Sequence, residues 1–300
     1  MKKSKYIKQE HYIRLIYLGL ILLFSCINME GQTKRAFLVG ISNYDQNTEN
    51  AWCLIHGAND VELLSPTLKR QGFKINKLCN KAATANKIRK NLASLASSCR
   101  AGDIVYIHFS CHGQPVEDLD GDEDDGWDEA IVPYDAQKVY QKGIYTGENH
   151  IIDDELNDYL RSIRTKVGPK GFVYMTIDAC HAGSSYRGEE EDRIIVRGTN
   201  RGFTPSGKPF APKIDKRGNI KIEKSPEMAN ICVLEACRSY QVNSEIREKG
   251  IYYGSLSFYV NKALQTSSFD RHSSWADRAR QLMDADVRLV RQNVVIEYSF

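Results

Sequence analysis

Short apolar runs alternate along the chain with longer segments whose apolar positions recur at helical spacing. The apolar runs are typical of buried strands and lie at residues 35–41, 73–78, 104–109, 171–177 and 231–235. The helical spacing predicts helices at residues 61–70, 84–96 (capped by Thr84), 153–163 and 252–264. Because strands and helices alternate, the pattern predicts an α/β fold with a mostly parallel sheet.

A long segment without periodicity interrupts this pattern. Residues 186–224 contain glycine, proline and ten lysines or arginines. We interpret residues 186–228 as an exposed basic loop within a single domain at residues 32–300. The loop separates a part at residues 32–185 from a smaller part at residues 229–300.

The amino terminus is basic and then apolar. Five lysines or arginines lie within the first fourteen residues, and an apolar run follows at residues 15–24. This run is shorter than the roughly 20 residues of a membrane-spanning helix, so residues 1–31 are predicted to be a secretory signal peptide, with a short membrane anchor as the alternative. The residues before Cys26 are similar to a bacterial lipoprotein signal, although Phe24 is bulky for its position. The protein is expected to be exported, as a periplasmic or extracellular protein or as a lipoprotein held at the membrane through Cys26.

The composition excludes several classes of protein but does not identify a binding partner. The 300 residues are 42% hydrophobic and 26% charged, which is typical of a globular protein. A net charge of only +3 gives no sign of a nucleic-acid partner. Eight cysteines are too few for a disulfide scaffold, and no Cys-x-x-Cys pair suggests zinc.

Two predicted strands end in residues with catalytic chemistry. Cys111 and His112 follow one strand, and Cys180 and His181 follow another. Because parallel strands place their carboxyl ends at one edge of a sheet, where α/β folds form active sites, His112 and Cys180 are expected to meet there. A thiolate forms readily beside an imidazole, so this pair is typical of a cysteine peptidase.

The neighbours of this pair have separate expected roles. The backbone N–H groups of Gly113 and Cys180 are expected to form an oxyanion hole. His181 is a weaker candidate base, because a residue adjacent to Cys180 should point away from its thiol.

At these motifs the chain resembles the metacaspases, caspase-like cysteine peptidases. The similar segments are SCHG at residues 110–113, DACHAG at 178–183, the acidic stretch at 117–135 and IIDDEL at 151–156, within an overall resemblance spanning 34–264. The resemblance implies a caspase-hemoglobinase fold, with about six mainly parallel strands and helices on both faces. It also implies a bacterial cysteine endopeptidase in which Cys180 is the nucleophile and His112 transfers the proton.

The resemblance further implies cleavage of proteins or peptides after Arg or Lys. The family's acidic pocket corresponds here to Asp60, Asp178 and Ser110. Carboxylates can hold a guanidinium through charge-assisted hydrogen bonds, which agrees with this specificity. The alternative for Asp60 is a solvated residue at a helix start.

The resemblance also implies a calcium site, formed by Asp128, Asp153 and Asp154. The family's fourth ligand corresponds to Arg187, which cannot bind a cation. Either residues 189–192 substitute, or the site is weak, or calcium dependence has been lost. An EF-hand is excluded by the pattern, and the remaining alternative is a solvated acidic loop in which Asp153 caps a helix.

The basic loop and two further cysteines complete the predictions. An enzyme that cuts after Arg or Lys is expected to cleave itself within residues 187–224, the alternative being a surface loop that other proteases can cut. Cys111 replaces the family's glycine, either as a tolerated small residue or as a redox partner of Cys180. Cys237 is interpreted as structural.

Two rival functions remain open. The chain could be a catalytically idle caspase-like module that senses calcium or binds a partner, or a related peptidase with another primary specificity. A monomer is expected.

Overall fold

The computed structural model describes residues 32–44, 51–121, 123, 125–181, 194–212, 214, 219–222, 224–269 and 273–300. The chain divides into two units, and nearly all of the first, Met1–Gln32, lies outside these residues. The predicted signal peptide and Cys26 therefore lie outside the described part and stay predictions. No helix in the described part is long and apolar enough to span a membrane.

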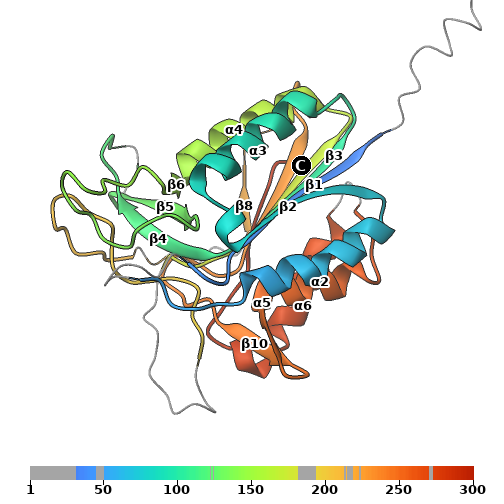
Figure 1. The fold of residues 1–300 in the computed structure, drawn as a ribbon. Coiled ribbons are helices and arrows are strands. Elements are labelled where there is room, and N and C mark those ends of the chain that lie inside the picture. The colour runs from blue at the N-terminus through green and yellow to red at the C-terminus, as the bar shows by residue number, and fades with distance from the viewer. Residues whose placement is uncertain are drawn as a thin grey trace, which may run out of the picture. The chain divides into compact units, whose positions relative to one another are not determined.

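A seven-stranded sheet forms the centre of the second unit, Thr33–Phe300 (Figure 1). Its order is β2 (Phe73–Cys79), β1 (Lys34–Gly40), β3 (Ile104–Ser110), β7 (Phe172–Asp178), β9 (Asn230–Glu235), β12 (Val295–Tyr298) and β8 (Asn219–Lys221). The first five strands are mutually parallel, and β12 runs antiparallel to β9. The predicted mostly parallel α/β sheet is confirmed, with β8 as a strand that the sequence did not indicate.

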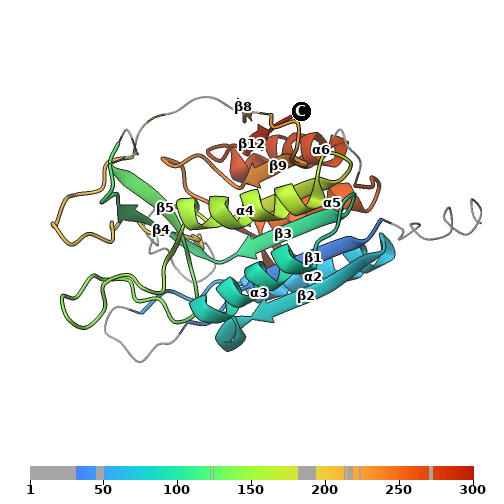
Figure 2. The same ribbon diagram turned by 90° about the horizontal axis from the view of Figure 1, so that it is seen from above.

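Helices cover both faces of this sheet (Figure 2). One face carries α3 (Ala85–Ser98) and α4 (Asp153–Val167), and the other carries α2 (Gly57–Arg70), α5 (Ser255–Leu264) and α6 (Ser274–Asp284). Two apolar clusters, one on each side, contain residues such as Ile107 and Val173, or Leu64 and Trp275. The alternating pattern predicted this burial, and the Thr84 side chain caps α3 as expected.

Smaller elements extend from the carboxyl edge of the sheet. Three antiparallel strands, β4 (His112–Glu117), β5 (Trp127–Val132) and β6 (Ile151–Ile152), form a second sheet, and β10 (Glu245–Glu248) pairs with β11 (Ile251–Gly254). Short 3₁₀ helices lie at Asn80–Ala82 and Val287–Leu289. The second sheet begins at His112, so it continues directly from the end of β3.

The prediction of an exposed loop at residues 186–228 is wrong for its described middle part. Val196 and Phe203 are almost fully buried, and Arg197 has no exposed surface. Periodicity could not reveal this, because the burial of a guanidinium depends on carboxylates supplied by distant segments.

Candidate active site

His112 and Cys180 lie on neighbouring strands at one edge of the sheet. Ser110 of β3 is the register partner of Asp178 of β7. His112 lies two residues after Ser110, and Cys180 lies two residues after Asp178. Because the strands are parallel and adjacent, both residues emerge at the same edge. The structure therefore places the two residues that the sequence singled out at the same edge of the sheet.

The imidazole of His112 is enclosed by two aromatic rings. The indole of Trp52 stacks on it at 5.0 Å between ring centroids, and the Tyr44 ring lies at 5.2 Å. Nε2 donates a hydrogen bond to the carbonyl oxygen of Cys53 at 2.8 Å, which assigns the proton to Nε2. Nδ1 is buried without a hydrogen-bond partner in the structure, so it is the nitrogen able to accept a proton.

The thiol of Cys180 is also buried. Its side chain donates a hydrogen bond to the carbonyl oxygen of Gln241 at 2.9 Å, and the residue is 1% exposed. Its backbone N–H donates to the carbonyl oxygen of Arg197 at 3.0 Å, and the N–H of Gly113 donates to the same oxygen at 3.1 Å. The two N–H groups expected to form an oxyanion hole therefore converge on one peptide carbonyl of the chain itself.

The side chain of Arg197 enters a pocket of carboxylates. Its Nη2 lies 2.8 Å from Oδ2 of Asp60 and 2.8 Å from Oε1 of Glu245, and its Nη1 lies 3.7 Å from Oδ1 of Asp178. Nη1 also donates a hydrogen bond to the hydroxyl of Ser110. All three carboxylate side chains are fully buried. Asp60, Asp178 and Ser110 thus form one pocket, and the alternative of a solvated Asp60 is wrong.

Burial and charge act against each other in this pocket. Burial raises the pKa of Asp60 to about 7, although the guanidinium of Arg197 lowers it. Burial also raises the pKa of Asp178, but Arg197 and hydrogen bonds from Asn243 and Ser257 outweigh it, so the net shift is downward. The pocket therefore stabilises a cation and is strained without one.

Residues 195–197 pair with the chain as a short added strand. Val196 forms an antiparallel bridge with Ser244, the Arg197 N–H donates to the carbonyl of Asn243 at 3.1 Å, and the Glu245 N–H donates to that of Ile195 at 2.9 Å. This is the manner in which an extended peptide binds to a strand edge. A side chain on the next residue, Gly198, would place its Cβ 2.0 Å from the carbonyl oxygen of Cys180, so glycine is required there.

Several residues of this site were missed by sequence reasoning. Glu245 and Asn243 lie on or beside β10, far along the chain from the two motifs, and Tyr44 and Trp52 come from the segment after β1. Nothing in their local spacing signals chemistry. Only the ten basic residues in the loop offered a signal for Arg197, and they did not distinguish it from the others.

The three predicted calcium ligands are near one another but do not converge. Burial, followed by the charges of Asp153, Asp118 and Asp154, raises the pKa of Asp128 to about 7. Among the described residues, however, no group of three or more acidic, cysteine or histidine side chains is arranged to hold a metal. The alternative that Asp153 caps α4 is wrong, because Ile152 occupies the N-cap and Oδ1 of Asp153 accepts a hydrogen bond from the Glu129 N–H at 3.1 Å.

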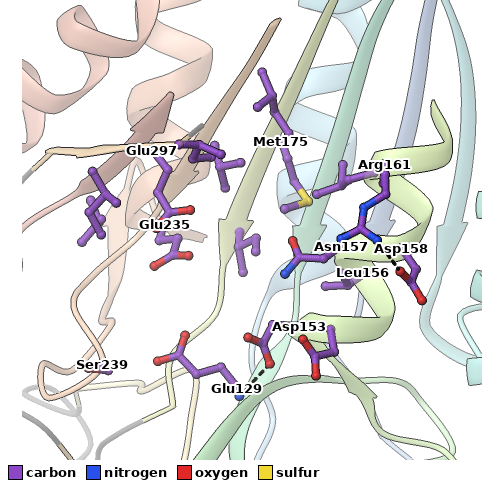
Figure 3. A pocket seen from close by; sticks show the side chains of 18 of the residues that line it. Glu129, Asp153, Leu156, Asn157, Asp158, Arg161, Met175, Glu235, Ser239 and Glu297 are labelled. Atoms are coloured by element: carbon purple, nitrogen blue, oxygen red, sulfur yellow. Dashed lines mark hydrogen bonds and ion pairs between the residues drawn. The ribbon is translucent and has the colours of Figure 1, made fainter. Parts of the chain in front are cut away.

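A cavity of about 840 Å³ lies beside these aspartates (Figure 3). Glu129, Asp153 and Glu235 point into it, and Met175 is one of its apolar lining residues. His181 faces this side, with Nδ1 3.5 Å from Oε2 of Glu129. His181 is thus paired with Glu129, in line with the expectation that it does not face the Cys180 thiol.

Solved structures place the fold in the caspase-like class. The chain resembles a protein from Geobacter sulfurreducens with a TM-score of 0.59 and 20% identity, over 89% of this chain and 93% of that one. It resembles Caspase-1 from Spodoptera frugiperda with a TM-score of 0.52 and 13% identity, over 90% of each chain.

Sequence comparison then gives the family. Residues 34–187 match the model of the metacaspase, peptidase C14 domain, and the chain belongs to that family. Metacaspase-1 of Meyerozyma guilliermondii is 30% identical over 55% of this chain and 38% of that protein. Metacaspase-1 of Mycosarcoma maydis is 25% identical over 77% of this chain and 62% of that protein. The chain thus spans less than two thirds of the length of these relatives.

The environment of His112 predicts an unusually acidic imidazole. Burial lowers the pKa of His112 to about 4, even though the hydrogen bond to Cys53 opposes this shift. NMR of histidine-labelled protein should therefore show a neutral His112 ring from pH 8 down to about 5.5. Replacing Trp52 with alanine should expose the ring and raise the midpoint toward the unperturbed value of about 6.5. A midpoint near that value in the unmodified chain would contradict the burial of His112.

Proposed function

We propose that this chain is a cysteine endopeptidase that cleaves peptide bonds after Arg or Lys, with Cys180 as nucleophile and His112 as general base. One observation carries the proposal: the carbonyl of Arg197 accepts hydrogen bonds from Gly113 and Cys180 while its guanidinium occupies the acidic pocket. A peptide substrate bound in the same way would have its scissile carbonyl at the thiol.

The proposed reaction begins with a turn of the Cys180 side chain. The thiol leaves the Gln241 carbonyl and gives its proton to Nδ1 of His112, the nitrogen without a partner. The sulfur attacks the carbonyl carbon, and the N–H groups of Gly113 and Cys180 stabilise the oxyanion, a contribution of roughly 3 kcal/mol per donor. His112 then protonates the leaving amine, and water releases the acyl group from Cys180.

Charge accounts for the proposed specificity. Three buried carboxylates surround a single cation, so an acidic side chain in the pocket would be strongly repelled. The Nε and Nη2 groups of Arg197 both donate to Oε1 of Glu245, at 3.1 and 2.8 Å. A lysine ammonium cannot reproduce this paired contact, so Arg should be preferred to Lys.

The same geometry supports self-processing at one bond. Among the basic residues described in the loop, Arg197 fills the pocket, and Gly198 follows it against the Cys180 backbone. We propose that the enzyme cleaves itself between Arg197 and Gly198. Until that bond is cut, residues 195–197 occupy the position of a substrate.

Calcium stimulation is a separate part of the proposal. The donors Asp128, Asp153 and Asp154 are hard carboxylate oxygens, which suit calcium, and their mutual repulsion would be relieved by a cation. These side chains would need to move closer to share an ion.

The first prediction from the proposed function concerns peptide hydrolysis. Fluorogenic peptides ending in Arg should be cleaved, those ending in Lys more slowly and those ending in Asp not at all. Replacing Cys180 with alanine should abolish turnover. Glu245→Gln should lower kcat/KM for Arg peptides about 10–100-fold through the lost charged contact, whereas Glu248→Gln on the same strand should not. Preference for another residue would support a different specificity, and no hydrolysis of any peptide would support an idle module.

The second prediction concerns the self-cleavage bond. The purified chain should yield a fragment whose amino terminus is Gly198, identified by mass spectrometry. Arg197→Gln should remove this fragment, while Arg201→Gln, which changes an exposed neighbour, should not. Equal fragmentation of the Cys180→Ala variant, or a new terminus elsewhere in the loop, would exclude the proposed bond.

The third prediction concerns the metal. Terbium, a calcium analogue, should show luminescence sensitised by Trp127, which adjoins Asp128, and calcium should displace it. Asp128→Asn should weaken terbium binding about tenfold or more, whereas Asp158→Asn, at an exposed position of α4, should not. Equal binding by both variants, or no signal, would remove calcium from the account.

A further inference from the structure

A second cysteine lies beside the candidate nucleophile. Ile177 of β7 is the register partner of Glu235 of β9, so Cys180 and Cys237 follow the ends of two adjacent parallel strands. Adjacent strands are about 4.8 Å apart, and a disulfide requires Cα atoms about 4.4–6.8 Å apart. Cys180 and Cys237 therefore extend from neighbouring strands whose spacing is compatible with a disulfide.

The two sulfurs point to the same place. Cys180 Sγ donates to the carbonyl oxygen of Gln241 at 2.9 Å, and Cys237 Sγ contacts the same oxygen at 3.6 Å. The two side chains pack together in a small buried cluster, 1% and 6% exposed. Sulfurs that share one acceptor can meet after a rotation of the side chains.

Cys111, the redox partner considered from the sequence, lies in a different environment. It packs in the large apolar cluster with Val132 and Tyr44, whereas Cys180 and Cys237 belong to a separate cluster. Burial raises the pKa of Cys111 to about 12, which keeps it a thiol. The geometry thus favours Cys237.

We propose that Cys180 and Cys237 form a reversible disulfide when the protein meets a hydroperoxide, and that this bond stores the nucleophile in a protected, inactive state. The loss of peptidase activity in this state rests on the proposed function, whereas formation of the disulfide requires no peptidase activity.

The chemistry balances in two steps. The Cys180 thiolate attacks an oxygen of the hydroperoxide, the O–O bond breaks, and an alcohol, or water from hydrogen peroxide, leaves after taking up a proton. The Cys237 sulfur then attacks the resulting sulfenic acid, the S–O bond breaks, and hydroxide leaves as water with the Cys237 proton. The two sulfurs lose two electrons in all, which reduce the O–O bond, and an external dithiol reverses the process by exchange.

The resting state is consistent with this order of events. A hydrogen bond with Cys180, followed by burial, raises the pKa of Cys237 well above its usual range. Cys237 therefore holds its proton at neutral pH, which suits it to the second step, in which its sulfur attacks the sulfenic acid and its proton leaves with the water.

The test is a peptide map of the full, reduced chain after treatment with hydrogen peroxide. The remaining thiols are alkylated and the protein is digested without reduction. A peptide pair linked through Cys180 and Cys237 is expected in the unmodified chain and in a Cys79→Ser control, which alters a half-buried cysteine of β2. Dithiothreitol should restore alkylation of Cys180 in both.

The Cys237→Ser variant should lack this protection. After excess peroxide, the fraction of Cys180 recovered by dithiothreitol should be about tenfold lower than in the unmodified chain, because sulfinic acid forms irreversibly. Linkage of Cys180 to Cys53 or Cys111, oxidation of Cys180 without any linkage, or a complete absence of oxidation would overturn the proposal. The map of the unmodified chain decides the matter even if the variant does not fold, and it is read independently of hydrolysis.

Discussion

The burial of one guanidinium among three carboxylates is the interaction on which the site depends. Asp60 comes from α2, Asp178 from the end of β7 and Glu245 from β10, so Arg197 joins three separate elements. Removing one partner of a buried ion pair commonly costs about 3–5 kcal/mol, because the remaining charge is left without compensation. The pocket is thus selective for a cation for the same reason that it is unstable without one.

Backbone geometry places the carbonyl of Arg197 at the proposed site of reaction while its guanidinium pairs with the carboxylates. The parallel register of β3 and β7 sets the Gly113 and Cys180 amides side by side, and the strand-like pairing of residues 195–197 sets the carbonyl of Arg197 between them. Glycine is needed where the chain passes closest. A Cβ on Gly113 would lie 2.6 Å from the carbonyl oxygen of Cys180, so a larger residue there would displace the amide.

The sequence was sufficient for much of the fold, because strand and helix periodicity reflects which side chains are buried. It also located His112 and Cys180, since both follow recognisable strands. Glu245, Asn243 and Trp52 could not be found in this way, because each acts through a contact made only when distant segments fold together. Arg197 was predicted to be exposed, because a basic residue in an aperiodic segment is usually solvated. Its burial is possible only because three carboxylates from distant segments compensate its charge.

The rate at which Cys180 is alkylated by peptidyl chloromethyl ketones tests the central claim most directly. The self-processed chain is suited to this measurement, because residues 195–197 no longer hold the position of a substrate once the bond between Arg197 and Gly198 is cut. The account predicts that an arginyl reagent modifies Cys180 at least about a hundredfold faster than an aspartyl reagent of the same length, and that Glu245→Gln reduces the difference. Equal rates for the two reagents, or modification of another cysteine in place of Cys180, would contradict it.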